Sequence, residues 1–228
     1  MNEKKWAIIV AAGRGSRFGG EIPKQFVLLN ERPVIAYSME VFFQLQYQLV
    51  VVLHPDDVSY FQHLAQAYQL PTYHAAIGGE QRFHSVQNAL ALIPADDTTI
   101  VAVHDAARPN IDLEFLQQLE NEVVGKGNAI PALAVHDSLR MKSGAQWVAV
   151  QRDNFRIIQT PQYFMSSILK KAYQQSYTSL FTDDASVLES LGVSIHLVNG
   201  KWGNIKITQG PDLNWMSHLI SGQEKNEQ

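Results

Sequence analysis

Residues 6–25, "WAIIVAAGRGSRFGGEIPKQ", join a short apolar run to a loop with four glycines, two arginines, a lysine and a proline. The apolar run is typical of a buried strand. Glycine has no Cβ, so the backbone after this strand can approach a ligand closely. The basic side chains indicate that such a ligand is an anion. From these residues alone, a solvated surface loop with incidental basic residues is an equal alternative.

The rest of the chain predicts an α/β fold of the Rossmann-like type, with a mostly parallel sheet and helices on both faces. Apolar residues recur at helical spacing in 56–68 and in 112–124. In such folds, ligands bind beyond the carboxyl ends of the strands. Further β-branched runs indicate strands at "QLVVVL" (48–53), "TIVAVHD" (99–105), "AIPALAV" (129–135), "SIHLV" (194–198) and "NIKIT" (204–208).

Residues 138–151, "SLRMKSGAQWVAVQ", interrupt this alternation and predict a protruding β-hairpin arm around the turn "KSGA". A lone hairpin is marginally stable in water, so it must pack on a surface. The edge of the same domain and a second subunit are both possible surfaces. The length allows one large α/β domain or two small ones. Because we find no repeat and no low-complexity linker, we expect a single domain over 1–228.

Composition limits the partners and the compartment. The formal net charge of −4 and the sequence pI of about 6.0 give no general electrostatic attraction to nucleic acid or to a membrane surface. The chain has no cysteine, which excludes disulfides and thiolate metal sites. The first apolar run is too short for a signal peptide or a membrane span, so a cytoplasmic location is expected. The eight histidines show no zinc-binding spacing.

The glycine loop differs from two common phosphate-binding loops. A Walker A loop requires Gly-Lys five positions after its first glycine, and neither Gly13 nor Gly15 has it. A dinucleotide fingerprint would place a small residue at Phe18 and start a helix where Pro23 stands. What remains is a loop whose N–H groups can face phosphate oxygens, with Arg17 and Lys24 as accompanying cations.

Six motifs together resemble a known family. In their order and spacing they are similar to the 2-C-methyl-D-erythritol 4-phosphate cytidylyltransferase family, within the sugar-phosphate nucleotidyltransferase superfamily. The resemblance covers residues 6 to about 215. The motifs are "AAGRGSRFGGEIPKQF" (11–26), "GGEQRFHSV" (78–86), "VHDAARP" (103–109), "QTPQYF" (159–164), "TDDASVLE" (182–189) and "NIKIT" (204–208).

The resemblance implies that the chain transfers a cytidylyl group from CTP to 2-C-methyl-D-erythritol 4-phosphate. The products would be 4-diphosphocytidyl-2-C-methyl-D-erythritol and pyrophosphate, in non-mevalonate isoprenoid precursor synthesis. It further implies that Asp105 holds Mg²⁺, although a strand-end Asp is more often a turn or helix cap. Lys206, which by itself would be expected to face solvent, becomes a third cation on the triphosphate. The implied catalytic residues are Arg17, Lys24 and Lys206, and the implied nucleotide-binding residues are Ala11, Ala12, Gly13, Gly15, Gly79, Glu80, Ser85, Asp105 and Ala106.

For the second substrate, the resemblance implies contacts from five further residues. It also implies that the arm crosses to a partner subunit and helps to build the partner's site, which makes a homodimer functional. Ser138 stands where the family commonly has Thr, and Asp184 stands where Glu is common. Both changes keep the hydrogen-bonding type. The implied substrate-binding residues are Arg108, Ser138, Arg152, Thr160 and Thr182.

Two other functions are open. A ribitol-5-phosphate cytidylyltransferase shares the loop, the Asp motif and "TPQ", but it tends to have Ala-Gly-Gly in place of "AAG" and Ala-Val-Arg in place of "AAR". A non-catalytic nucleotide-binding regulator would not need three cations together with Asp105.

Overall fold

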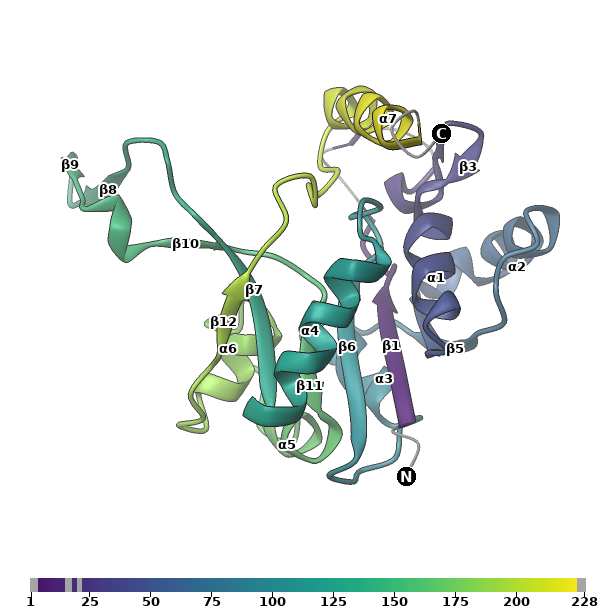
Figure 1. The fold of residues 1–228 in the computed structure, drawn as a ribbon, viewed down its shortest axis with the longest axis horizontal. Helices are drawn as coiled ribbons and strands as arrows, with labels where there is room; N and C mark the ends of the chain where they lie inside the picture. Colours follow the sequence, from purple (N-terminus) through teal and green to yellow (C-terminus); the bar gives the residue numbers. More distant parts are fainter. Residues whose placement is uncertain (1–3, 15–17, 20–21, 225–228) are drawn as a thin grey trace.

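The computed structural model describes residues 4–14, 18–19 and 22–224. Its main sheet has eight strands in the order β10-β7-β11-β6-β1-β4-β5, and β12 pairs with β7 (Figure 1). The strands are β1 (Lys4–Val10), β4 (Gln48–Leu53), β5 (His74–Ile77), β6 (Thr99–Asp105), β7 (Asn128–Ala134), β10 (Arg156–Ile158), β11 (Gln162–Met165) and β12 (Leu197–Asn199).

The centre of the sheet is parallel. Strand β1 pairs in parallel with β4 on one side and with β6 on the other, and β5 pairs in parallel with β4. Strand β11 is antiparallel to both β6 and β7, and β10 is antiparallel to β7, so the sheet is mixed. From β1 the chain runs outward through β4 to β5 and then crosses back to β6 on the other side of β1, which makes the carboxyl end of β1 a topological switch point. The register places Val10 beside Asp105 at that edge.

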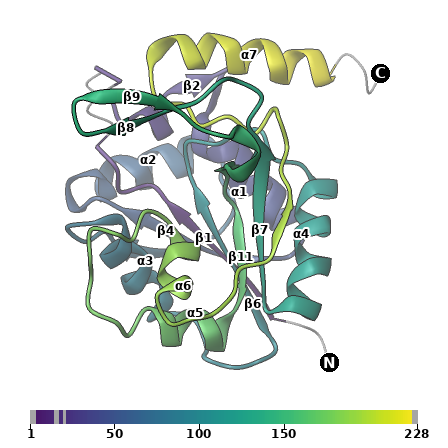
Figure 2. The same ribbon diagram turned by 90° about the vertical axis from the view of Figure 1, so that its left-hand side faces the viewer.

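Helices cover both faces of the sheet, as the sequence predicts, with α3 on one side and α4 on the other (Figure 2). In β1, Ile9 faces a core cluster with α1, α2 and α4, whereas Ile8 faces a cluster with α3, α5 and α6. Full burial of such a side chain contributes about 1.5–3 kcal/mol. The helices are α1 (Val34–Gln44), α2 (Val58–Ala67), α3 (Arg82–Leu90), α4 (Leu113–Lys126), α5 (Ser166–Ala172) and α6 (Asp184–Glu189). Of the helices within the described ranges, none has the length and apolarity to cross a bilayer.

A third, smaller cluster attaches the C-terminal helix above the carboxyl edge of the sheet. Helix α7 (Gly210–Glu224) packs Met216 and Ile220 against Leu29, Val34 and Ile207. Leu29 belongs to a short antiparallel pair, β2 (Leu28–Leu29) with β3 (Arg32–Pro33), that follows the 3₁₀ turn η1 (Lys24–Phe26). The end of the chain thereby covers the segment that follows the glycine loop.

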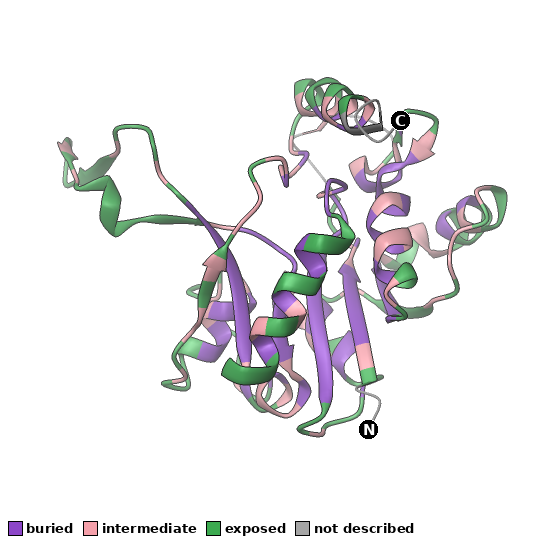
Figure 3. Cartoon of the chain, viewed as in Figure 1, coloured by how far each residue is buried: buried purple, intermediate pink, exposed green. Residues whose placement is uncertain are grey.

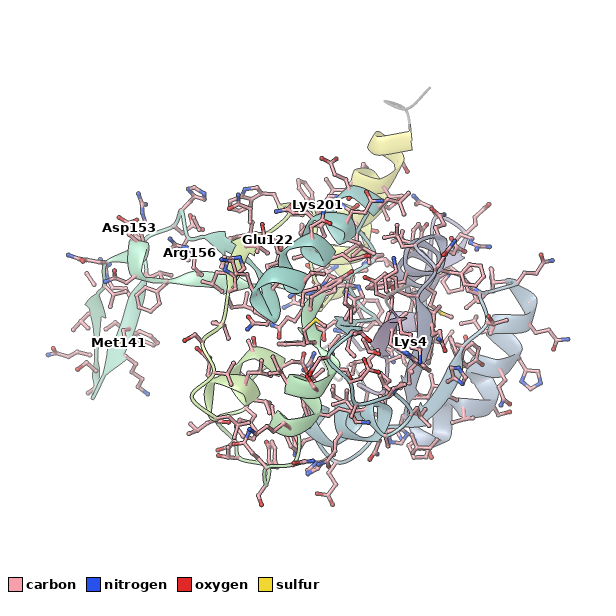
Figure 4. All side chains as sticks on the ribbon, turned by 60° about the horizontal axis from the view of Figure 1, so that its bottom comes forward. Lys4, Glu122, Met141, Asp153, Arg156 and Lys201 are labelled. Atoms are coloured by element: carbon pink, nitrogen blue, oxygen red, sulfur yellow. The ribbon has the colours of Figure 1, made fainter. Side chains whose placement is uncertain are left out.

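The predicted hairpin arm is present as β8 (Arg140–Ser143) and β9 (Gln146–Ala149), followed by the 3₁₀ turn η3 (Arg152–Asn154). It extends away from the sheet, and its residues are mostly exposed (Figures 1 and 3). Figure 4 labels Met141, Asp153 and Arg156 along it, far from Lys4 at the start of β1. Trp147 in β9 is 67 % exposed. The arm therefore presents apolar side chains that this chain does not cover.

One predicted strand is wrong. Residues 204–208 form no strand in the structure. Ile205 and Ile207 alternate because they pack against the α7 cluster, not because they line a sheet. The segment is instead fixed by individual bonds, in which Ile207 N donates to Ala107 O and Thr208 N donates to the carboxylate of Asp212. The run 194–198 is also shifted, since β12 begins at Leu197.

Candidate active site

A cavity of about 550 Å³ opens beyond the carboxyl ends of β1, β4, β5 and β6. This is the switch-point edge at which the strand order reverses, so the sheet itself fixes the position of the cavity. Segments from both ends of the chain line it. They include Ala12, Gly13 and Arg14 after β1; Lys24 and Gln25 in η1; His54 after β4; Gly79, Glu80, Gln81, Arg82 and Ser85 near α3; Asp105 and Ala107 at β6; and Lys206 and Thr208 before α7.

Asp105, at the end of β6, is the centre of a charged cluster. Its Oδ2 accepts a hydrogen bond of 2.8 Å from Lys206 Nζ, and its Oδ1 accepts one of 3.3 Å from Arg82 Nε. Arg108 Nε lies 3.7 Å from Oδ2. Burial alone would raise the pKa of Asp105, but the positive charges of Arg82, Lys206 and Arg108 outweigh it and hold that pKa well below its usual range. The carboxylate is therefore ionised at neutral pH.

The backbone of Asp105 is held by a buried side chain. Its N–H donates to Oγ1 of Thr160, a buried residue between β10 and β11, over 3.0 Å. The same Oγ1 of Thr160 lies 3.4 Å from Nδ1 of the buried His104. Burial lowers the pKa of His104 to about 4, so its ring is neutral at neutral pH. Thr160 thus fixes the backbone at the end of β6.

Lys24 and Lys206 reach the cavity from opposite ends of the sequence. Lys24 Nζ donates to Ile207 O over 2.6 Å, so the turn η1 is attached to the segment that carries Lys206. That segment is continued by Thr208, whose N–H and Oγ1 both donate to Asp212 of α7 over 2.7 Å. Helix α7 therefore holds both lysines in place through its first turn.

The glycine-lined side of the cavity depends on close backbone approach. A Cβ on Gly78 would come within 2.4 Å of the Ala12 Cβ, and one on Gly79 within 2.4 Å of the His84 Cβ. Gly79 N donates to Ser85 Oγ over 3.1 Å, and Gln25 Nε2 donates to Ala11 O over 2.6 Å. The loop before α3 therefore approaches the loop after β1 so closely at Gly78 that this position has no room for a side chain.

The structure brings a first group of the predicted site residues to the cavity and places a second group next to it. The first group comprises Ala12, Gly13, Lys24, Gly79, Glu80, Ser85, Asp105 and Lys206. The second comprises Ala11 and Ala106, which are buried and adjoin lining residues in the chain, and Arg108 and Thr160, which contact Asp105. Gly15 and Arg17 lie outside the described residues.

Three predicted substrate-binding residues do not reach the cavity within this chain. Ser138 and Arg152 are exposed on the arm, where Arg152 donates to His136 O. Thr182 is exposed just before α6. A role for these three residues in substrate binding therefore stays a prediction.

Sequence reasoning missed Arg82, Gln25 and Asp184. Arg82 lies inside the quoted motif "GGEQRFHSV" and is the helix-start cation nearest to Asp105. Its position in that motif was a usable signal. Asp184 lies inside the quoted motif "TDDASVLE", but its partner Arg82 is 102 positions away, so no local pattern predicts that the two residues pair.

Within the described part of the chain, no group of three His, Cys, Asp or Glu side chains is placed to hold a metal ion. The donor chemistry nevertheless fits Mg²⁺, which commonly takes one or two protein carboxylates and completes its shell with substrate phosphates and water. Asp105 is ionised, reaches the cavity surface and is oxygen-donating. A metal at this site would depend on the triphosphate for most of its ligands.

Comparisons with known proteins agree with this arrangement. The 2-C-methyl-D-erythritol 4-phosphate cytidylyltransferase family model matches residues 6–221. The proteins of that name from Bacteroides thetaiotaomicron and Bacteroides fragilis are 39 % and 38 % identical, over 95 % and 94 % of this chain and 100 % and 98 % of theirs. The crystal structure of the Francisella tularensis protein of that name has a TM-score of 0.77 and 30 % identity, over 93 % of this chain and 97 % of that one. The chain therefore belongs to the 2-C-methyl-D-erythritol 4-phosphate cytidylyltransferase family and is a cytidylyltransferase.

Proposed function

We propose that this cavity binds CTP and that the enzyme transfers its cytidylyl group to 2-C-methyl-D-erythritol 4-phosphate. The products are 4-diphosphocytidyl-2-C-methyl-D-erythritol and pyrophosphate. The observation that carries the proposal is the pairing of Lys206 and Arg82 with Asp105, in a glycine-lined cavity that Lys24 also lines. Such a cluster suits a polyphosphate whose charge is redistributed during reaction.

In the reaction, an oxygen of the sugar 4-phosphate forms a bond to the α-phosphorus of CTP. The bond from that phosphorus to the oxygen bridging to the β-phosphorus breaks, and pyrophosphate leaves with the electron pair. A phosphate monoester is already anionic near neutral pH, so no general base is required. Positioning and charge neutralisation carry the rate.

Lys24 and Lys206 are proposed to neutralise the charge that builds up on the oxygens of the α- and β-phosphates. Both ammonium groups lie beside the cavity, and both have mobile stems that can turn toward a phosphate. Arg17 is proposed to join them from the glycine loop. Removal of one such contact typically costs about 3 kcal/mol in the transition state, or about 10²-fold in rate.

Asp105 is proposed to hold Mg²⁺ together with oxygens of the triphosphate. When bound, the metal neutralises phosphate charge and fixes the leaving group. The chain's contribution is an ionised carboxylate held by Lys206 and Arg82, on a backbone whose N–H is bonded to the Thr160 hydroxyl. Binding of the triphosphate can take over Lys206 and so free one oxygen of Asp105.

Recognition of the cytosine ring is assigned to the loop before α3. Gly79 and Glu80 present backbone groups at the cavity wall, and Ser85 is held against Gly79 N. Main-chain groups can hydrogen-bond the edge of a pyrimidine, and a purine would be excluded by its size and by unpaired polar groups. Ala12 also lines the cavity, and the small buried side chains of Ala11 and Ala106 are proposed to let the backbone beside it approach the nucleotide closely.

A homodimer formed through the arm is part of the proposal. Met141 and Trp147 are 53 % and 67 % exposed on the hairpin, and Phe155 and Ile157 are 41 % and 49 % exposed at its base. Ser138 and Arg152 on the arm would then reach the partner's sugar phosphate, while Arg108 and Thr182 contribute from the same chain. Light scattering tests this directly, and a monomeric mass at micromolar concentration would contradict it.

The substrate is tested by incubating the enzyme with CTP, Mg²⁺ and each sugar phosphate in turn. Pyrophosphate release with methylerythritol phosphate supports the proposal. Release with ribitol 5-phosphate alone would assign the other cytidylyltransferase activity. No release with either would favour a nucleotide-binding regulator.

A further inference from the structure

Arg82, the first residue of α3, joins two carboxylates from distant parts of the chain. Its Nε donates to Asp105 Oδ1 over 3.3 Å, and its two terminal nitrogens donate to both oxygens of Asp184 over 3.0 and 2.7 Å. Asp105 ends β6 and Asp184 begins α6. The planar fork of Arg is suited to this, because it offers paired donors at a fixed geometry.

The far side of this bridge is rigid. The Asp184 side chain is fully buried, and it also accepts a 2.6 Å hydrogen bond from Tyr173 OH. The Tyr173 ring stacks on Phe83, the residue after Arg82, with 4.7 Å between ring centroids. The packing of Phe83 thus anchors the backbone next to Arg82, and Asp184 holds the two terminal nitrogens of its guanidinium. Its Nε is left to contact Asp105 at the cavity.

The bridge also sets the charge at the cavity. Asp184 compensates the charge of Arg82, so the pair is neutral as a unit. If Arg82 stood beside Asp105 with no second carboxylate, its full charge would oppose the binding of any further cation there. With Asp184 in place, Arg82 can orient the Asp105 carboxylate while offsetting less of its negative charge.

We infer that Arg82, locked by Asp184, is a positioning residue that orients the Asp105 carboxylate and preserves its capacity to bind a metal–triphosphate. This inference rests on the proposed function of the site. It assigns no contact between Arg82 and substrate. It explains why the two acidic residues Asp105 and Asp184 share one arginine.

The test uses the charge-balanced double variant Arg82→Gln with Asp184→Asn in the full-length enzyme. The two amides can hydrogen-bond each other, and neither leaves a buried charge without a partner. We expect a Tm within about 5 °C of the wild type. We expect kcat to fall about 10–100-fold, the usual effect of losing a group that orients a metal ligand.

A binding measurement supplements activity. Mn²⁺ replaces Mg²⁺, a CTP analogue with a methylene between the α- and β-phosphorus replaces CTP, and free Mn²⁺ is followed by electron paramagnetic resonance. The Kd of Mn²⁺ in the enzyme–analogue complex should rise about tenfold in the double variant. Wild-type values of both kcat and this Kd would overturn the inference.

Arg82→Lys is the second variant, used if the double variant does not fold. It keeps the positive charge beside Asp184 but cannot bond both carboxylates with a planar fork. We expect kcat to fall to about one fifth of the wild-type value or lower at an unchanged Tm, since a misaligned metal ligand slows the reaction. A wild-type kcat would overturn the inference. The matched control replaces the partly buried pair at the opposite end of β1, Lys5→Gln with Glu120→Gln, and should leave kcat close to the wild type.

Failure of this inference is distinguishable from failure of the proposed function. If the wild-type enzyme releases no pyrophosphate with either sugar phosphate, the proposed function is wrong. The Mn²⁺ measurement still reports on Arg82 in that case. If the wild-type enzyme is active and the variants match it, only the role of Arg82 is wrong.

Discussion

Nζ of Lys206 lies 2.8 Å from Oδ2 of Asp105, although the two residues are 101 positions apart in the chain. Asp105 is placed by the end of a fully buried strand, and Lys206 is placed by a segment that α7 holds over that strand. The contact therefore forms only when the C-terminal helix has docked on the sheet. The charge cluster in this cavity is therefore a product of long-range packing.

Lys206→Ala should lower kcat about 10²-fold, because it removes one of the proposed cations at the reacting phosphates. It also leaves Asp105 with two positive neighbours instead of three. Pyrophosphate release under saturating CTP measures the effect. Lys171→Ala, an exposed lysine on α5, is the control and should retain wild-type kcat. Equal rates for the two variants would contradict the assignment of Lys206.

Lys24→Ala should depress kcat more than it weakens CTP binding. In the free enzyme Lys24 is bonded to Ile207 O, so its ammonium has to move to a phosphate as charge develops. Steady-state kinetics with CTP as the varied substrate separates kcat from KM, and calorimetry with a non-reactive analogue gives the Kd. An unchanged kcat with a raised Kd would assign Lys24 to ground-state binding instead.

Thr160→Val should destabilise the fold by about 1–3 kcal/mol, because the N–H of Asp105 loses its acceptor in a buried position. It should also lower kcat, since the end of β6 is no longer fixed. Urea unfolding and pyrophosphate release measure the two effects. Thr160→Ser keeps the hydroxyl and should lie close to the wild type in kcat; if Ser and Val behave alike, the hydroxyl is not the reason.

Gly78→Ala should weaken CTP binding with a smaller effect on the fold. The new Cβ would meet the Ala12 Cβ at 2.4 Å and the Leu53 carbonyl oxygen at 3.3 Å, so the loop after β1 must shift. A raised Kd for CTP, measured by calorimetry, is the expected result. Gly125→Ala on α4, where a Cβ meets nothing within 4 Å, is the matched control and should leave this Kd unchanged.

Asp212→Asn should destabilise α7 in a pH-dependent way. Hydrogen bonds from Thr208 lower the pKa of Asp212 below its ordinary value of 3.8, so the ionised form is favoured by folding. That contribution is present above about pH 4 and is lost as the pH falls through the folded pKa. We expect a cost of about 0.3–1 kcal/mol at pH 7, because Asn can still accept these hydrogen bonds but lacks the negative charge at the helix N-terminus, and this cost shrinks as the pH falls below about 4. Urea unfolding across this acidic range and at neutral pH measures it, and a difference that stays constant with pH would contradict this cause.

Much of this fold follows from local sequence. The apolar runs that form β1, β4 and β6 predict a mostly parallel sheet, because strands buried on both faces need side chains that are apolar throughout. The glycine loop and the strand-end Asp105 then predict a site at the carboxyl edge of that sheet. The hairpin at 138–151 is also predicted, since its pattern has no helical period.

Other features of the fold could not be predicted from local sequence patterns. The alternation in 204–208 is that of a strand, yet its isoleucines face α7, and only the docked helix distinguishes the two environments. The antiparallel strands β10 and β11 are short and lie beside strands far away in sequence.

The sequence by itself determined which residue types are available for phosphate chemistry and which edge of the sheet presents them. Local patterns of apolar residues and glycine contain that information, because each acts within a few positions of the chain. The tertiary structure decided the partners: Lys206 and Arg82 on Asp105, Asp184 behind Arg82, and Thr160 beneath Asp105. These contacts join residues between 23 and 102 positions apart, so their charges and hydrogen bonds come together only through long-range packing.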